Sequence, residues 1–212
     1  MHEGRSGGRH PARAGLPAVA AVTLVMAFVG ASGAVMAGDM REIGFLGDKA
    51  AVGRLEEELY SGALATDGDL LQRAGDLGVR LAIRDDKAKV SEEEGVLVGE
   101  VTSLEGGVLS RRRLYASAGS YAIVDIVGPA VTVRGRGGAS NFVVLGNELA
   151  KAVANRMIRE RWRDGTLEDA AGILVRSIEA ASAASPSVGR NFLVVQTRKR
   201  VDLGRFLGRA GE

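Results

Sequence analysis

Chemistry in this 212-residue chain must come from a short set of side chains. The sequence holds no cysteine, and its two histidines, His2 and His10, both lie within the first 22 residues. Beyond those residues, cysteine nucleophiles, Ser-His-Asp triads and zinc sites built on histidine or cysteine are excluded. A catalytic base in the rest of the chain must therefore be a carboxylate, a lysine, a tyrosine or a chain terminus.

Thr23 could combine a nucleophile with such a base. A threonine hydroxyl is a weak nucleophile at neutral pH and needs an adjacent base. If translation began at Val22, for which GTG is a common initiator codon, removal of the initiator methionine would leave Thr23 as the first residue. Its free α-amine, with a pKa of about 7.7–8.0, would suit general-base catalysis near neutral pH. One residue could thus supply both groups.

The segment around Thr23 supports two interpretations. Three arginines precede residues 14–38, which hold no charged side chain, and this pattern is typical of a signal peptide or a membrane anchor. Alternatively, residues 23–29 and 34–38 form two buried strands joined by a glycine-rich turn. Residues 1–22 are then a leader, either a propeptide or an incorrectly assigned start. The glycines at 30, 33 and 38 favour the hairpin.

Charge and composition narrow the class of protein. Beyond residue 22 the chain has no net charge, which argues against a basic nucleic-acid-binding body. With 46% hydrophobic residues it can bury a sizeable core. The glycine-rich residues 134–140 do not match a dinucleotide-binding fingerprint, because the spacing differs and a strand follows where a helix is required. We expect no metal and no cofactor.

Hydrophobic periodicity indicates which elements must position these residues. Two helix pairs alternate with groups of strands, which predicts an α+β fold of stacked layers rather than repeated βαβ units. Residues 84–94 are expected to form a charged connector, and residues 198–212 a solvated basic tail. Helices are predicted over 51–60, 67–77, 147–161 and 166–183, and further strands over 79–83, 96–101, 108–116, 121–127, 131–133, 142–145 and 192–197.

Four segments resemble the connectases, a proteasome-related family of methanogenic archaea. They are residues 35–39 (VMAGD), 56–62 (EEELYSG), 96–101 (VLVGEV) and 111–113 (RRR), in the family's order. Asp39 also follows Thr23 by sixteen residues, as an aspartate follows the N-terminal threonine of proteasome β subunits. The resemblance implies a four-layer αββα N-terminal-nucleophile fold, with one domain over 23–212 and an inserted lobe at about 48–110.

The resemblance also implies an activity. Connectases are threonine-dependent protein ligases (transpeptidases): the N-terminal residue attacks within a Lys-Asp-Pro-Gly-Ala-type motif, holds the upstream fragment as an acyl-enzyme and passes it to a polypeptide beginning Pro-Gly-Ala. The implied partner is one polypeptide of the methanogen methyltransferase complex, its A component, and a cytoplasmic monomer is expected. Two alternatives stay open: a proteasome-like threonine peptidase or amidase, and a non-enzymatic exported or membrane-anchored binding protein.

Asp39 would orient a lysine or the terminal amine, by the same resemblance. The lysine found thirty-two residues after the nucleophile in proteasome β chains is Leu55 here. The cation that pairs with Asp39 is therefore left open between Lys49, the nearest lysine in the sequence, and Arg41, the nearest cation.

Two serines resemble the further site serines of proteasome β chains. Ser140 follows a Gly-Gly pair, and Ser187 precedes Val188-Gly189 and the last predicted strand. The aspartate that normally stands three residues before the second serine is Ala184 here. Both serines are also common turn residues.

Arg111, Arg112 and Arg113 are candidates for substrate binding. Consecutive arginines on a strand are usually a solvated edge. Alternatively, one guanidinium binds the aspartate of the substrate, because arginine holds a carboxylate in a bidentate fork. The inserted lobe is expected to hold the peptide and to exclude water from the acyl intermediate.

Overall fold

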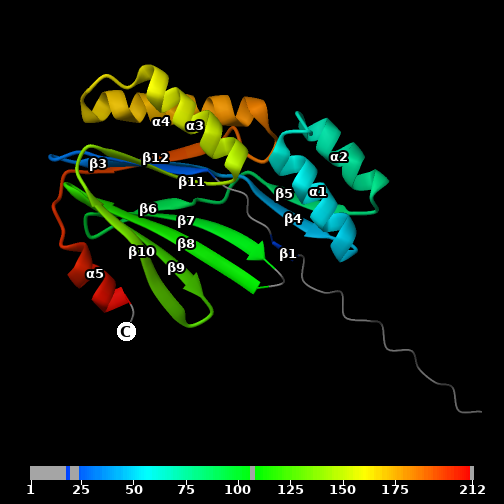
Figure 1. Cartoon of the computed structure of the whole chain (residues 1–212), viewed down its shortest axis with the longest axis horizontal. Coiled ribbons are helices and arrows are strands. Elements are labelled where there is room, and N and C mark those ends of the chain that lie inside the picture. The colour runs from blue at the N-terminus through cyan, green and yellow to red at the C-terminus, as the bar shows by residue number, and fades with distance from the viewer. Residues whose placement is uncertain (1–17, 20–23, 106–107, 211–212) are drawn as a thin grey trace, which may run out of the picture.

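A hairpin of apolar strands lies at the centre of the computed structural model, which describes residues 18–19, 24–105 and 108–210 (Figure 1). Strands β2 (Val25–Val29) and β3 (Ala34–Asp39) are buried at every residue, as strands covered on both faces must be. The hairpin predicted for residues 23–38 is thus confirmed over its described part. Among the described residues, no helix is long and apolar enough to cross a membrane.

Two antiparallel sheets are built around this hairpin. In the first, β11 (Asn141–Leu145) pairs with β2 and β12 (Phe192–Thr197) pairs with β3, so the order is β11-β2-β3-β12. The second sheet has five strands in the order β10 (Ala130–Gly138), β9 (Ser120–Val127), β8 (Val108–Ser117), β7 (Val96–Glu105) and β6 (Val90–Glu93).

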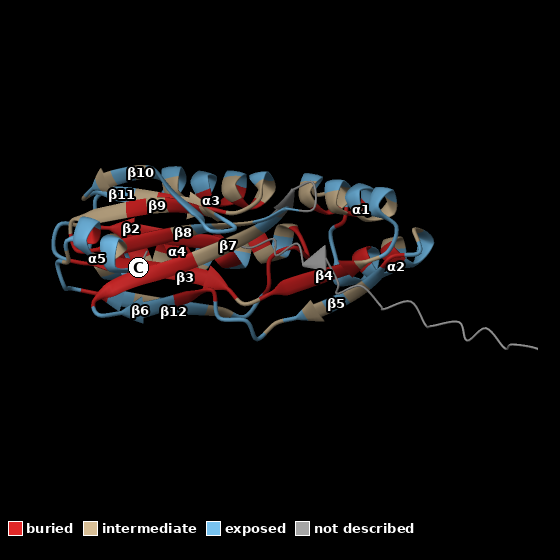
Figure 2. Cartoon of the chain, turned by 90° about the horizontal axis from the view of Figure 1, so that it is seen from below, coloured by how far each residue is buried: buried red, intermediate tan, exposed pale blue. Residues whose placement is uncertain are grey.

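Helices cover the outer faces of both sheets. Helices α3 (Glu148–Arg161) and α4 (Leu167–Ala184) pack on the four-stranded sheet, and α5 (Leu203–Ala210) packs on the five-stranded sheet (Figures 1 and 2). A separate apolar core fills the space between the two sheets. The protein is therefore an α+β fold of four layers in the order αββα, as predicted.

A lobe with its own core projects beyond the end of the sheets (Figure 1). It consists of β4 (Glu42–Leu46), α1 (Lys49–Ser61), α2 (Asp67–Asp76) and β5 (Arg80–Arg84). Strand β1 (Ala18–Val19) pairs with the edge of β4 that faces away from β5. Of the predicted insertion at 48–110, residues 49–84 belong to this lobe, whereas residues 90–93 and 96–105 form two strands of the five-stranded sheet.

Three segments differ from the prediction. Residues 90–93 of the expected connector form β6, and β10 continues through the expected glycine loop. Gly137 leaves room for the ring of Tyr121 on the neighbouring strand, because a Cβ at this position would lie 2.3 Å from that ring. The expected tail forms α5, which Asp202 caps by accepting the Gly204 and Arg205 amides, and which buries Leu203.

Candidate active site

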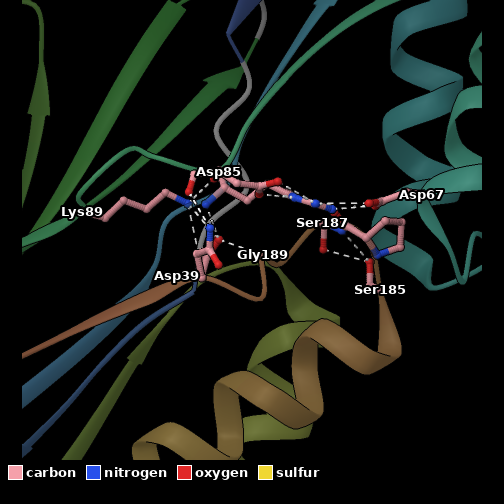
Figure 3. A network of polar contacts seen from close by, with 10 residues as sticks. Asp39, Asp67, Asp85, Lys89, Ser185, Ser187 and Gly189 are labelled. Atoms are coloured by element: carbon pink, nitrogen blue, oxygen red, sulfur yellow. Dashed lines mark hydrogen bonds and ion pairs between the residues drawn. The ribbon is translucent and has the colours of Figure 1, made fainter.

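Asp39, the last residue of β3, is a fully buried carboxylate. Its Oδ1 accepts the backbone N–H of Leu24 at 2.9 Å, and its Oδ2 accepts the N–H groups of Arg41 and Gly189, both at 3.0 Å. Lys89 Nζ lies 3.1 Å from each carboxylate oxygen (Figure 3). A buried charge is tolerated only when it is paired and hydrogen-bonded in this way. Asp39 thus joins the chain directly after Thr23 to a lysine and to the loop before β12.

Lys89 is the cation of this pair and lies directly before β6. Its side chain is only 4% exposed, and Nζ also donates to the backbone carbonyl of Arg41. Burial lowers the pKa of Lys89 from its ordinary value, and this effect outweighs the attraction of Asp39, which raises the pKa. A lysine of this kind can lose its proton nearer to neutral pH than an exposed one, as a general base must.

Ser187 lies beside this pair in the loop between α4 and β12 (Figure 3). It is fully buried, and its Oγ receives hydrogen bonds from Asn147 Nδ2 at 3.1 Å and from Ser185 Oγ at 2.9 Å. Asn147 is also the N-cap of α3, where its Oδ1 accepts the amide of Ala150, as the sequence predicts. Ser187 and Gly189 belong to one loop. Through Gly189 this loop binds Asp39, and through Ser187 it binds Asn147 at the start of α3.

The residues that the sequence predicts for the site differ in where the structure places them. Thr23 lies outside the described residues, so its role stays a prediction. The partner of Asp39 is neither of the two nearest cations: Lys49 is exposed at the first position of α1, and Arg41 gives Asp39 only its backbone N–H. Lys89, fifty residues away in the sequence, takes that position.

Ser140 lies at the other end of the hairpin from Asp39. Its N–H donates to the carbonyl of Val29, whereas Asp39 is bonded to Leu24 at the opposite end of β2. The five residues of β2 separate these points by roughly 16 Å at the usual rise of a strand. The structure therefore brings Ser187, but not Ser140, to the candidate site.

A cleft of about 980 Å³ adjoins the site. One wall comes from α1, with Glu56, Glu57 and Tyr60, and the floor at the start of α3 includes Asn147. The opposite wall is formed by β7 to β10. Since Asn147 donates to Ser187, the cleft begins next to the candidate site and passes between the lobe and the five-stranded sheet.

Arg112 is the member of the arginine run that lines the cleft. Its guanidinium forms a fork with Asp125, at 2.6 and 3.0 Å, and Arg134 approaches the same carboxylate at 2.7 Å. These two guanidinium groups lower the pKa of Asp125 to about 2, and the hydrogen bond from Arg112 has the largest effect. Arg113 binds Glu100 at 2.6 Å instead, and Arg111 is half-buried on β8.

Tyr60 and Glu56 are two half-buried polar residues on the lobe wall of the cleft. The Tyr60 hydroxyl is buried without a hydrogen-bond partner in the part of the chain that the structure describes. Burial raises the pKa of Tyr60, and the nearby Glu56 carboxylate raises it further. Burial also raises the pKa of Glu56. No cluster of His, Asp and Glu suited to a metal ion occurs within residues 18–19, 24–105 and 108–210.

Lys89 and Arg134 are the functional candidates that the sequence did not reveal. Lys89 ends a segment of mixed charge over residues 84–89, and the only sign of a strand there is Val90, the apolar residue that follows it. Arg134 falls within the glycine-rich segment that was expected to be a loop.

Comparison with known proteins gives one strong match. Residues 22–205 match the family model described as "Connectase MJ0548-like, N-terminal domain". No curated protein matches the chain.

Among solved structures, the chain is similar to eukaryotic HslV from Trypanosoma brucei, with 17% identity, a TM-score of 0.34, and coverage of 82% of this chain and 98% of that one. The Anbu complex from Pseudomonas aeruginosa shows 14% identity, a TM-score of 0.39, and coverage of 82% and 80%. Anbu from Yersinia bercovieri shows 11% identity, a TM-score of 0.38, and coverage of 82% and 81%.

Proposed function

Because the chain belongs to the connectase family, we propose that it is a protein ligase of the N-terminal-nucleophile type whose working chain begins at Thr23. Thr23 Oγ attacks the peptide bond before proline in a Lys-Asp-Pro-Gly-Ala-type motif, and the upstream fragment becomes an ester on that oxygen. The proline nitrogen of a second polypeptide, beginning Pro-Gly-Ala, then attacks the ester. A new peptide bond joins donor and acceptor, and the Thr23 oxygen recovers its proton.

The observation that carries this proposal is the buried Lys89–Asp39 pair beside Leu24, the residue that follows Thr23. Both carboxylate oxygens of Asp39 and the carbonyl of Arg41 surround Lys89 Nζ. Because Asp39 also accepts the N–H of Leu24, we propose that the Thr23 hydroxyl of the working chain comes within reach of Lys89 Nζ. Neutral Lys89 accepts the hydroxyl proton as the C–O bond forms, and this proton passes to the proline nitrogen as the C–N bond breaks. The α-amine of Thr23 is the second group able to accept it.

The cleft supports a polypeptide substrate. Its volume of about 980 Å³ is at the upper end of the range for ligand pockets. The lobe wall presents Glu56 and Glu57, and the sheet wall presents Arg112 and Arg134 around Asp125. We propose that the carboxylates contact the lysine of the motif and that the arginines contact its aspartate. Enclosure between the two walls then excludes water from the ester, which favours ligation over hydrolysis.

The test uses the chain shortened to begin at Thr23, a Lys-Asp-Pro-Gly-Ala donor peptide and a Pro-Gly-Ala acceptor peptide. Mass spectrometry is expected to show an ester adduct on the protein and then a joined peptide. Thr23→Ala should lose both products, whereas Thr23→Ser should retain them. An active full-length chain that still carries residues 1–22 would overturn the role of Thr23.

A proteasome-like peptidase is the second candidate, because the same nucleophile, base and cleft would also serve hydrolysis. The two differ in the acceptor, so the experiment separates them: a hydrolysed donor with no joined product identifies a peptidase. If ligation is observed, the A component of the methyltransferase complex is the proposed natural substrate, with the reaction taking place in the cytoplasm.

A further inference from the structure

Arg41 lies two residues after Asp39, and its side chain reaches three separate segments. Its Nε and Nη2 donate to Asp85 at 2.7 and 3.0 Å, and its Nη1 and Nη2 donate to Asp67 at 2.6 and 3.2 Å. Nη1 also donates to the carbonyl of Pro186 at 3.0 Å. These bonds use all five N–H donors of the guanidinium group. Arg41 is itself buried, with 8% of its surface exposed.

The three segments belong to different parts of the site. Asp67 begins α2 and therefore represents the lobe, Asp85 follows β5, and Pro186 lies in the loop that carries Ser187 and Gly189. Figure 3 shows Asp85 close to the Asp39–Lys89 pair, whereas Asp67 lies farther from that pair, beyond Ser187 in this view. One planar group thus fixes the lobe and the loop relative to each other.

The backbone of Arg41 holds the Asp39–Lys89 pair at the same time. Its N–H donates to Asp39, and its carbonyl accepts from Lys89. Gly189 packs directly on Arg41: a Cβ at this glycine would lie 2.7 Å from the Arg41 Cβ. Residue 189 can therefore place its amide on Asp39 only because it has no side chain.

We infer that Arg41 is a positioning residue that couples the placement of the lobe to the geometry of the Asp39–Lys89 pair and the loop over residues 185–189. This inference rests on the proposed function for its catalytic meaning. The coupling has two parts of unequal strength, here called the loop arm and the lobe arm. The loop arm is the buried contact of Arg41 to Pro186, and it is the stronger one. The lobe arm is the contact to Asp67, and it is weaker because the Asp67 side chain is 54% exposed to solvent. Loss of the Asp67 contact should loosen the lobe wall of the cleft, and loss of the guanidinium should loosen the loop as well.

Lysine cannot replace Arg41 in this role. A lysine ammonium has three donors on a single nitrogen, and it cannot form two forks and a fifth bond in fixed directions. Arg41→Lys therefore keeps the charge and changes only the geometry. Asp67→Asn keeps the shape and weakens only the lobe arm. Arg84→Lys is a matched control, because Arg84 is an exposed arginine of the lobe whose ion pairs are with Glu42 and Asp86.

The first measurement is amide hydrogen exchange by NMR on the chain beginning at Thr23. In Arg41→Lys, protection of the Gly189 amide should fall about tenfold or more, while protection of Ala27 and Met36 in the central hairpin should stay within about threefold. Arg84→Lys should change neither. Unchanged protection at Gly189, or an equal loss at all three amides, overturns the inference whether or not the protein is a ligase.

The second measurement is steady-state kinetics with the same donor and acceptor peptides. Arg41→Lys should lower kcat about tenfold or more, because small misplacements of catalytic groups have effects of this size. Asp67→Asn should raise the KM for the donor and the share of hydrolysed product, with kcat nearly unchanged. Equal changes in both variants overturn the two-arm description. A wild-type chain that forms no joined peptide contradicts the proposed ligase and leaves the exchange result to decide the role of Arg41.

Discussion

The two ends of the β2–β3 hairpin bury their polar groups in different ways. At one end, here called the charged end, lie Leu24, Asp39, Arg41 and Lys89, and the three ionic residues among them are at most 8% exposed. At the other, the turn end, backbone groups satisfy one another: Gly30 donates to Gly33, and Ser140 donates to Val29. Between the ends, both strands are uniformly buried.

This difference indicates where the fold serves function. Burial of an ion costs several kcal/mol, and a strand can end without that cost when a turn satisfies its backbone groups. The turn end of this hairpin ends in that way. A lysine and an aspartate buried together at the charged end, with a lowered pKa for the lysine, are the kind of perturbation that gathers at active sites.

Removal of the lysine should have the largest effect. Lys89→Met keeps the length of the side chain but leaves Asp39 buried without its cation. We expect acyl-enzyme formation to fall about 10³-fold, and the free energy of unfolding to fall by about 3 kcal/mol. Single-turnover mass spectrometry and urea unfolding measure the two effects. Lys49→Met, at an exposed position of α1, is the matched control; an equal loss there would remove the distinction between Lys89 and its neighbours in sequence.

The pH dependence of acylation should reveal the lowered pKa of Lys89. Below that pKa the amine is protonated, so the rate should fall about tenfold for each unit of pH, and it should level off at a pH below about 10.4, the ordinary lysine value. Arginine keeps its proton at all these pH values, so Lys89→Arg should abolish the plateau. A plateau that survives in Lys89→Arg would assign the base to the α-amine of Thr23 instead.

The two serines test the two ends directly. Ser187→Ala removes the acceptor of the Asn147 amide at the charged end, and we expect acylation to slow by about 10- to 100-fold. Ser140→Ala, at the turn end, should leave the rate unchanged. If both substitutions slow the reaction equally, the assignment of the site to the charged end is wrong.

The central fold was predictable because its signals are local. The apolar runs of β2 and β3 require burial on both faces, and Thr166 with Asp169 forms the capping box that the sequence suggests at the start of α4. Asp39, the carboxylate of the candidate site, could be predicted from its spacing of sixteen residues from Thr23. Each of these signals lies within one or two neighbouring elements.

The rest of the site depends on tertiary pairing. Lys89 reaches Asp39 only because β6 joins the five-stranded sheet and passes the end of β3, and a run of charges predicts no such strand. The sequence predicts Gly137 to be a turn residue, yet it belongs to strand β10 and leaves room for the Tyr121 ring. The same Gly-rich run made Ser140 resemble a site serine, although that strand ends at the turn end.

A smaller effect is expected at Asp125, whose ion pairs lie in the cleft rather than in the core. Its pKa of about 2 lies below that of the unfolded chain, so its ion pairs stabilise the fold above about pH 4 and are lost as the pH falls toward 2. Asp125→Asn should lower the free energy of unfolding at pH 7 by about 1–2 kcal/mol, because its arginines are half-exposed to solvent. Wild type and variant should converge near pH 2; a constant difference would contradict the ionic origin.

The smallest effect belongs to the turn end. Ser140 has a φ of 64°, in the left-handed region that favours glycine, and its side chain is exposed. Ser140→Gly should therefore raise the free energy of unfolding by about 0.5–1 kcal/mol with no change in acylation. Ser103→Gly, at an exposed position within β7, is the matched control and should lower stability by a similar amount. A gain in stability together with a loss of activity would show that the strained serine serves the reaction, and the contrast between the two ends would then fail.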